Sequence, residues 1–173
     1  MQLDLGGIAK GFAAERAVGV LRSHSLPISL VSLSGDVYAG DPPPGAEGWR
    51  VEIRGDRSGD DSPAIGTLWL RRAGVSTSGD ATQHVVVGGT RYSHILDPRT
   101  GLGVQSGRTV TVLSPRGIDA DALATALSVL GPADAEALLT RCRAAALFAD
   151  ESGATQIVDP FRQFRWHTQP APR

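Results

Sequence analysis

A glycine-rich segment close to the start of the chain contains the only lysine of the protein. The segment reads DLGGIAKG from Asp4 to Gly11, and Lys10 is the one lysine among 17 basic residues. Glycines let a backbone approach a ligand closely, and a helix that begins here would direct unpaired N–H groups at an anion. A flexible ammonium adds a point charge suited to phosphate. These features indicate a phosphate-binding turn, although such a segment taken alone is more often an ordinary turn with a solvated lysine.

A second candidate for chemistry lies in an apolar helix predicted over residues 118–130. Asp121 and Thr125 are four residues apart, so a carboxylate and a hydroxyl project from one face of that helix. Both are oxygen donors of the kind that Mg²⁺ accepts. Taken alone, such an aspartate is more often a first-turn carboxylate and such a threonine is bonded back to a carbonyl, and Asp119 competes as the acidic ligand.

Two further polar segments contain candidate residues. Residues 76–80 read STSGD and predict a glycine-containing polar turn. Residues 94–101 read HILDPRTG and follow the second strand of a predicted hairpin, so His94 and Asp97 are expected at a strand end, where the proline and glycine impose a sharp turn. Each segment taken alone is a simple turn, and a histidine in such a place is more often a surface side chain than a base.

The elements that must position these residues follow from the hydrophobic periodicity. It predicts a helix over residues 8–22, a second helix over 118–130 and a shorter one from Pro132 to about Arg141. Strands are predicted at residues 28–33, 49–54, 65–70, 85–87, 90–96, 109–113, 146–149 and 156–158, with loops at 41–48 and 55–63 and a Gly88-Gly89 hairpin turn. This order predicts an α+β fold with a mixed, mostly antiparallel sheet and two main helical segments. We expect a single domain over residues 1–160 and a partly disordered tail over 161–173.

The composition argues against several classes of function. The net charge is −1 without long runs of either sign, so no nucleic-acid partner is expected. No stretch approaches the roughly 20 apolar residues of a membrane span, and the first residues lack the pattern of a secretory leader. The chain as given is therefore expected in the cytoplasm, or in the cell envelope if an upstream leader exists. The single cysteine, Cys142, allows no internal disulfide and is expected to be a small core residue.

Five short segments occur in an order that points to one family. They are DLGGIAKG at residues 4–11, SGD at 34–36, STSGD at 76–80, HILDPRTG at 94–101 and ADALATAL at 120–127. In these segments the chain resembles the ApbE family, the FAD:protein FMN transferases, over about residues 3–158. The resemblance implies an ApbE-like, T-fold-like core.

The resemblance also implies a reaction and a set of site residues. Such enzymes require Mg²⁺, split FAD at its pyrophosphate and transfer FMN to a Thr or Ser hydroxyl of an acceptor flavoprotein, releasing AMP. By this resemblance the metal ligands would be the side chains of Asp121 and Thr125 and the carbonyl of Gly7, while Lys10 would hold the pyrophosphate. The other implied residues are Gly6, Thr77, Ser78 and Asp80, which would line the flavin and phosphate pocket, and His94 and Asp97, of which His94 would activate or position the acceptor.

The implied partners are FAD and an acceptor flavoprotein subunit of a membrane redox complex or reductase, with a second copy of the chain or a missing N-terminal half beside it. Family members usually carry a sizeable region before the DLGG motif, whereas this chain begins almost on it. Smaller departures are Ser34 and Ser93, which stand where the family often has glycine and a second histidine. Two alternatives therefore remain beside the transferase: a module that holds FAD or flavin without turnover, and an inactive truncated fragment from a misassigned start codon.

Overall fold

The computed structural model describes residues 1–54, 64–79, 83–162 and 166–168. Its largest element is a six-stranded antiparallel sheet with the order β1-β2-β5-β8-β9-β10. The strands of this sheet are β1 (Leu30–Leu33), β2 (Asp36–Ala39), β5 (Ala73–Ser78), β8 (Thr109–Ser114), β9 (Ala145–Ala149) and β10 (Thr155–Val158). The helices are α1 (Ala9–Ser23), α2 (Gly117–Leu130), the short 3-10 helix η1 (Pro132–Asp134) and α3 (Ala135–Cys142).

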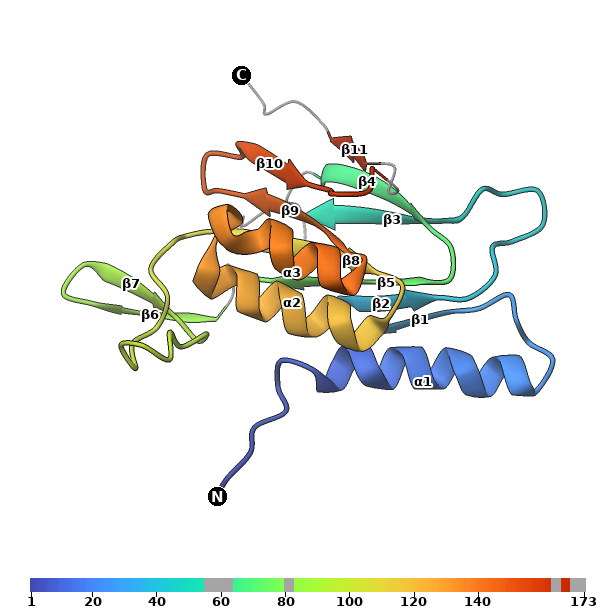
Figure 1. The fold of residues 1–173 in the computed structure, drawn as a ribbon, viewed down its shortest axis with the longest axis horizontal. Coiled ribbons are helices and arrows are strands. Elements are labelled where there is room, and N and C mark those ends of the chain that lie inside the picture. The colour runs from blue at the N-terminus through green and yellow to red at the C-terminus, as the bar shows by residue number, and fades with distance from the viewer. Residues whose placement is uncertain (55–63, 80–82, 163–165, 169–173) are drawn as a thin grey trace.

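Two smaller antiparallel sheets complete the fold. One has three strands in the order β11-β4-β3, namely β11 (Trp166–Thr168), β4 (Ala64–Leu70) and β3 (Trp49–Arg54). The other is the hairpin of β6 (His84–Val87) and β7 (Thr90–Ser93), which projects from one end of the molecule (Figure 1). The predicted α+β class with mostly antiparallel strands is therefore confirmed.

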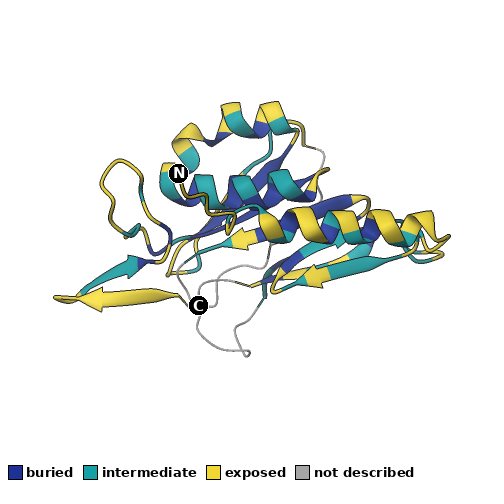
Figure 2. Cartoon of the chain, turned by 90° about the horizontal axis from the view of Figure 1, so that it is seen from below, coloured by how far each residue is buried: buried dark blue, intermediate teal, exposed yellow. Residues whose placement is uncertain are grey.

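The large sheet lies between two layers (Figure 1). The helices cover one face, where α2 and α3 pack on Val110 and Val112 of β8 and on Phe148 of β9. The three-stranded sheet covers the other face, where it packs on Leu113 of β8 and Leu147 of β9. Neighbouring residues of a strand point to opposite faces, so β8 and β9 are buried on both sides (Figure 2). A polar side chain on the helix-covered face of this sheet therefore points into the interior.

Two tight turns reverse the chain with residues in positive φ. The predicted Gly88-Gly89 hairpin is confirmed, with φ of 57° and 82° at its two glycines. Its second strand ends at Ser93, earlier than the predicted Leu96. Ser34 and Gly35 have φ of 50° and 95° and join β1 to β2 in the same way. Positive φ at both central residues is the geometry of a type I′ hairpin turn.

The remaining predicted elements agree with the structure except in four places. In place of the predicted polar turn at residues 76–80, residues up to Ser78 belong to β5, a strand inside the large sheet. The strand β2 was not predicted, and the predicted helix from Pro132 is divided into η1 and α3. The tail, in which no element was predicted, contributes β11, which pairs with β4. The predicted loop at 55–63 and residue Asp80 lie outside the described residues.

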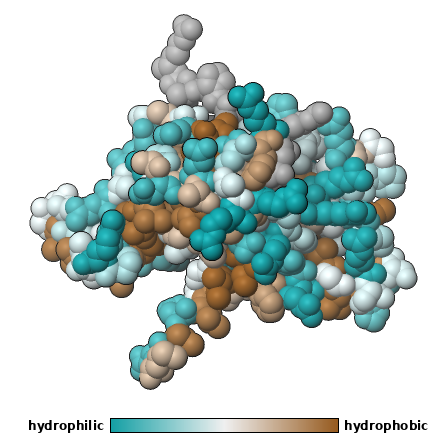
Figure 3. Space-filling model, viewed as in Figure 1, coloured by the Kyte–Doolittle hydropathy of each residue, from teal (hydrophilic) through white to brown (hydrophobic). Residues whose placement is uncertain are grey.

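The chain reaches the first helix through an extended N-terminal segment. Residues 1–5 lead away from the body of the molecule (Figure 3), and the side chains of Leu3 and Leu5 are 77% and 56% exposed. The glycine turn that follows this segment is exposed at Gly6 and half-buried at Gly7. The turn therefore lies at the surface, where a ligand can reach it.

Glycines bring α1, α2 and β5 into backbone contact. A Cβ atom on Gly11 would lie 2.2 Å from the carbonyl oxygen of Gly117, and one on Gly117 would lie 2.4 Å from the carbonyl oxygen of Gly11. A Cβ atom on Gly74 of β5 would lie 2.8 Å from the Cα atom of Gly117. Because no side chain separates the two helices here, residues in the first turn of α1 come within hydrogen-bonding distance of α2.

This contact predicts opposite effects for two glycine-to-alanine changes in the same helix. Gly11→Ala is expected to lower the free energy of unfolding by about 1–3 kcal/mol, because the methyl group would overlap Gly117 and lie 2.7 Å from the Cβ of Asp121. Gly19→Ala meets no atom within 4 Å and is expected to raise it by about 0.5–1 kcal/mol, since alanine favours a helix more than glycine does. Urea unfolding of both variants measures the difference, and equal effects would contradict the close contact.

Candidate functional site

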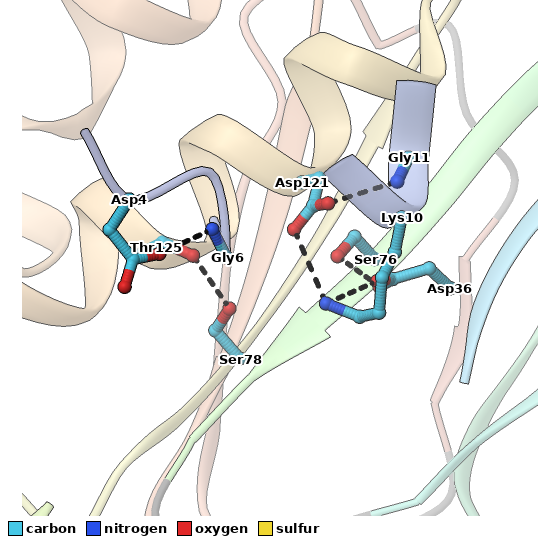
Figure 4. A network of polar contacts seen from close by, with 9 residues as sticks. All are labelled: Asp4, Gly6, Lys10, Gly11, Asp36, Ser76, Ser78, Asp121 and Thr125. Carbon is cyan, nitrogen blue, oxygen red and sulfur yellow. Dashed lines mark hydrogen bonds and ion pairs between the residues drawn. The ribbon is translucent and has the colours of Figure 1, made fainter. Parts of the chain in front are cut away.

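Lys10, Asp36 and Asp121 come together from three elements that are distant in the sequence (Figure 4). Lys10 Nζ lies 2.9 Å from Asp36 Oδ2 at the start of β2 and 3.8 Å from Asp121 Oδ1 on α2. The hydroxyl of Ser76 on β5 donates a hydrogen bond to Asp36 Oδ1. We call these four residues the lysine cluster. The N–H of Gly11 donates to Asp121 Oδ2 over 2.9 Å, so the start of α1 is bonded directly to α2.

Burial sets the electrostatics of the lysine cluster. Asp36 and Asp121 are 3% and 1% exposed, whereas the Lys10 side chain is 43% exposed. Burial raises the pKa of the Asp121 carboxyl, and the negative charge of Asp36 raises it further. The hydrogen bond from Gly11 and the charge of Lys10 act in the opposite direction but do not outweigh burial. Burial acts to lower the pKa of Lys10, but the hydrogen bond to Asp36 and the two carboxylate charges outweigh it and raise that pKa. The cluster thus contains two buried carboxyl groups but only one ammonium group, and this arrangement favours binding of a further cation.

One turn further along α2, Thr125 lies against the glycine turn (Figure 4). A Cβ atom on Gly7 would lie 3.2 Å from Thr125 Oγ1, so a larger residue would displace the threonine or the turn. Thr125 Oγ1 also lies 3.3 Å from Ser78 Oγ at the end of β5. The N–H of Gly6 donates to Asp4 Oδ1 over 2.7 Å, which shapes the turn before α1. The structure therefore brings the predicted residues Gly6, Gly7, Ser78 and Thr125 to one place, beside the lysine cluster.

The alternation of β5 separates its predicted site residues. Ser76 and Ser78 point to the helix-covered face, where they contact Asp36 and Thr125. Thr77 points to the opposite face, where its hydroxyl lies 2.8 Å from the hydroxyl of Thr111 on β8. The side chain of Thr77 is thus separated from the lysine cluster by the sheet. Asp80, predicted with it, lies outside the described residues.

His94 and Asp97 form a separate polar turn next to the β6–β7 hairpin. In the described part of the chain, no hydrogen bond or ion pair joins them to the lysine cluster. The exposed His94 has Nδ1 3.1 Å from the carbonyl oxygen of Gln83. Asp97 accepts hydrogen bonds from the backbone N–H and the guanidinium of Arg99. The Arg99 hydrogen bonds hold the pKa of the Asp97 carboxyl below its ordinary value. The carboxylate of Asp97 therefore serves to hold the turn together.

Asp36 and Ser76 are the members of the lysine cluster to which no role was given from the sequence. Both lie in segments that carry the family resemblance, SGD at residues 34–36 and STSGD at 76–80. The signal for Asp36 was its position directly after Ser34-Gly35, because a type I′ turn places the next residue at the first position of a returning strand. The pairing of β2 with β5, which no local pattern shows, is what brings the hydroxyl of Ser76 to it.

The oxygen atoms near Asp121 are a donor set that fits a hard cation. In the residues that the structure describes, no three His, Cys, Asp or Glu side chains gather in a way that could hold a metal ion. Asp121 and Thr125 nevertheless lie one turn apart on α2, and Gly7 lies so near Thr125 that a Cβ atom on it would be 3.2 Å from Thr125 Oγ1. One carboxylate, one hydroxyl and one carbonyl are ligands that Mg²⁺ accepts, since this ion usually keeps several waters and few protein ligands.

Two solved structures that share this fold are ApbE proteins. The chain matches the ApbE protein of Thermotoga maritima with a TM-score of 0.79 and 34% identity, over 93% of this chain and 52% of that one. It matches the apo form of the flavinyl transferase ApbE of Pseudomonas stutzeri with a TM-score of 0.74 and 34% identity, over 92% and 50% of the two chains. The architecture is therefore that of the ApbE flavin transferases.

Comparisons of the amino-acid sequence lead to the same family. The model of the ApbE family matches residues 1–148, and this chain belongs to that family. The FAD:protein FMN transferase of Treponema pallidum is 41% identical over 148 residues, which are 80% of this chain and 41% of that protein. The enzyme of Rhodobacter capsulatus is 38% identical over 136 residues, 78% of this chain and 25% of that protein. The chain thus spans less than half the length of these curated relatives. The longest described helix has 15 residues, and none has the length and apolar character that a membrane crossing requires.

Proposed function

We propose that this chain, alone or together with the remainder of a longer protein, transfers FMN from FAD to a Thr or Ser hydroxyl of an acceptor flavoprotein in an Mg²⁺-dependent reaction that releases AMP. The observation that carries the proposal is the buried Asp121 carboxyl beside the Lys10 ammonium, where the glycine turn meets α2. Curated relatives that match 80% and 78% of this chain are named FAD:protein FMN transferases.

The chain's own groups suit transfer of a phosphoryl-linked flavin. Asp121, Thr125 and the carbonyl of Gly7 would hold Mg²⁺, which when bound supplies positive charge at the pyrophosphate oxygens. Lys10, whose side chain is 43% exposed, has an ammonium that can reach the same oxygens. The acceptor oxygen forms a bond to the phosphorus on the FMN side, the bridging P–O bond breaks, and its electron pair leaves with AMP. In such a reaction the protein mainly positions groups and neutralises charge.

The acceptor hydroxyl must lose its proton, and we assign this step to His94. Its Nδ1 lies 3.1 Å from a carbonyl oxygen, which can only accept, so Nδ1 carries the proton of the neutral ring. Nε2 is then left with a lone pair that can take the hydroxyl proton. Asp97, bonded to Arg99 and accepting the N–H of Gly101 through its carbonyl, would keep the turn that presents His94 in shape. FAD and the acceptor, a flavoprotein subunit of a membrane redox complex or reductase, would meet between this turn and the lysine cluster.

A second candidate is a module that binds FAD without turnover. The segments of two curated relatives that match this chain make up 41% and 25% of those proteins. In that case the remaining part of the active site would come from a second polypeptide, either a separate N-terminal half or another copy of this chain.

Two substitutions of one ligand test the proposed function. The purified chain is incubated with FAD, Mg²⁺ and an acceptor protein, and covalent flavin is read as a fluorescent band that survives a denaturing gel. Thr125→Val keeps the shape of the side chain but removes its hydroxyl, and it is expected to weaken Mg²⁺ binding by about tenfold or more and to reduce labelling. Thr125→Ser keeps the hydroxyl and is expected to retain most of both.

The control for this experiment is Asp119→Asn. Asp119 is a carboxylate on the same helix that pairs with Arg116 rather than with the lysine cluster, so its variant should label the acceptor like the original chain. FAD binding that depends on Mg²⁺, without any labelled acceptor, would instead support the binding module. No binding of FAD at all would contradict both functions for this chain acting alone.

A further inference from the structure

We propose that Asp36 is the positioning residue of the site: it holds the Lys10 ammonium away from Asp121, so that Asp121 stays available for a divalent cation that binds before the nucleotide. The inference rests on the proposed function, since it concerns the same Mg²⁺ and pyrophosphate groups. It gives a role to a buried carboxylate that is neither a proposed metal ligand nor a group that reaches FAD.

The position of Asp36 is fixed by contacts other than the one with Lys10. It is the first residue of β2, directly after the Ser34-Gly35 turn, and it is 3% exposed. Its Oδ1 accepts the hydroxyl of Ser76 from the neighbouring strand, so the carboxylate cannot rotate freely. Its other oxygen, Oδ2, is left to face Lys10. A carboxylate that is held in place in this way can fix the position of the ammonium group of a flexible lysine side chain.

The two distances from Lys10 show which carboxylate holds it. The ammonium lies 2.9 Å from Asp36, a hydrogen-bonding distance, but 3.8 Å from Asp121, which is a looser ion pair. In the described residues, Asp36 and Asp121 are the carboxylates with which Lys10 forms ion pairs. Without the charge of Asp36, the ammonium would therefore move onto Asp121 and compete with the cation for its oxygen atoms.

The charges of the lysine cluster favour binding of the divalent cation before FAD. With Asp36 and Asp121 ionised and Lys10 charged, the cluster carries a net charge of −1. The pyrophosphate of FAD would meet a repulsive site before the cation binds, whereas a bound divalent ion changes the net charge to +1 and makes the site attractive. The same residues thus disfavour FAD without the cation and favour it afterwards.

A double-mutant cycle on the full chain tests the positioning role. Mg²⁺ is titrated by calorimetry into the original chain, Asp36→Asn, Lys10→Met and the double variant, and FAD is then titrated with and without Mg²⁺. Asp36→Asn is expected to weaken Mg²⁺ binding by about tenfold, the size typical of residues that support a metal ligand. Lys10→Met is expected to bind Mg²⁺ at least as tightly as the original chain, and to bind FAD more weakly when Mg²⁺ is present.

The decisive result is the double variant. If Asp36 acts by holding Lys10, removing the lysine also removes the competition, and the double variant should recover Mg²⁺ binding to within about threefold of the original chain. A double variant as weak as Asp36→Asn alone would show that Asp36 only maintains the fold, and would overturn the inference. Ser76→Ala, which frees Asp36 without removing it, should shift Mg²⁺ binding in the same direction by a smaller factor, and it serves in place of Asp36→Asn if that variant does not fold.

The outcome also separates this inference from the proposed function. Asp119→Asn removes one negative charge, as Asp36→Asn does, but Asp119 pairs with Arg116 and lies outside the lysine cluster. This variant should therefore bind Mg²⁺ and FAD like the original chain. If the original chain binds FAD in an Mg²⁺-dependent way and Asp36→Asn behaves like Asp119→Asn, the positioning role is wrong and the proposed function stands. If the original chain shows no Mg²⁺-dependent binding, both the positioning role and the function of this chain acting alone are wrong.

Discussion

Replacing Asp121 by asparagine is expected to abolish the Mg²⁺-dependent reaction and, at the same time, to stabilise the metal-free chain at neutral pH. The first effect follows from the loss of the one carboxylate among the proposed ligands, which should weaken Mg²⁺ binding by more than about 100-fold. The second follows from burial, which disfavours the ionised form of Asp121 despite the hydrogen bond from Gly11 and the charge of Lys10. The amide oxygen of asparagine can still accept the Gly11 N–H.

The stabilising effect has a defined dependence on pH. Because the pKa of Asp121 is raised above its ordinary value of 3.8 in the folded chain, its favourable contribution is complete below that pH and is lost as the pH rises through the raised pKa. Asparagine does not titrate. The free energy of unfolding of the variant, measured against that of the original chain in metal-free buffer, should therefore increase as the pH rises from about 4 through the raised pKa of Asp121 and then level off.

Mg²⁺ should reverse this order at neutral pH. At about 100 times its dissociation constant, a ligand that binds only the folded state adds about 2.7 kcal/mol to the free energy of unfolding. The original chain should gain this amount and the variant should not. Urea unfolding at several pH values, with and without Mg²⁺, measures both effects, and Asp119→Asn is the control. A variant that is less stable than the original chain in metal-free buffer at every pH would contradict the assignment.

Replacing His94 by alanine is expected to slow the transfer of FMN by about 100-fold or more while leaving Mg²⁺-dependent binding of FAD unchanged. The physical reason is that His94 is exposed and bonded through Nδ1 to Gln83, so its other nitrogen can take the acceptor proton without contacting the cation site. Single-turnover labelling of the acceptor gives the rate, and a binding titration gives the affinity for FAD.

Two controls separate a base from a structural histidine. His24→Ala removes another exposed histidine, at the end of α1, and should leave the rate unchanged. Imidazole added to His94→Ala should restore part of the rate if the ring takes a proton, but not if it only supports the turn. Equal loss of FAD binding and of rate would assign His94 to the binding site instead.

The local parts of this fold could be predicted from the sequence. The helices α1 and α2 follow from apolar residues at helical spacing, and the turn at Gly88-Gly89 follows from two residues that tolerate positive φ. In the site, the i to i+4 spacing of Asp121 and Thr125 was sufficient to place a carboxylate and a hydroxyl on one face of α2.

The long-range parts could not be predicted in this way. The local sequence predicts a polar turn at residues 76–80 because serine is common in turns, whereas in the structure Ser76 and Ser78 belong to β5, point to the helices and bond to Asp36 and Thr125. The role of Asp36 depends on the pairing of β2 with β5, and the backbone contact of Gly11 with Gly117 joins two helices across most of the chain. Such contacts depend on three-dimensional packing, and no window of local sequence contains them.

The hydrogen bond from Gly11 to Asp121 spans 110 positions, and this distance has a consequence for the order in which the chain folds. Closing so long a loop carries a larger entropic penalty than forming local helices and hairpins, so we expect α1 to dock on α2 late, after the strands that lie between them in the sequence have paired. A cation bound at Asp121 would then stabilise contacts that are absent from the transition state. It should lengthen the lifetime of the folded chain against unfolding while leaving the rate of folding nearly unchanged.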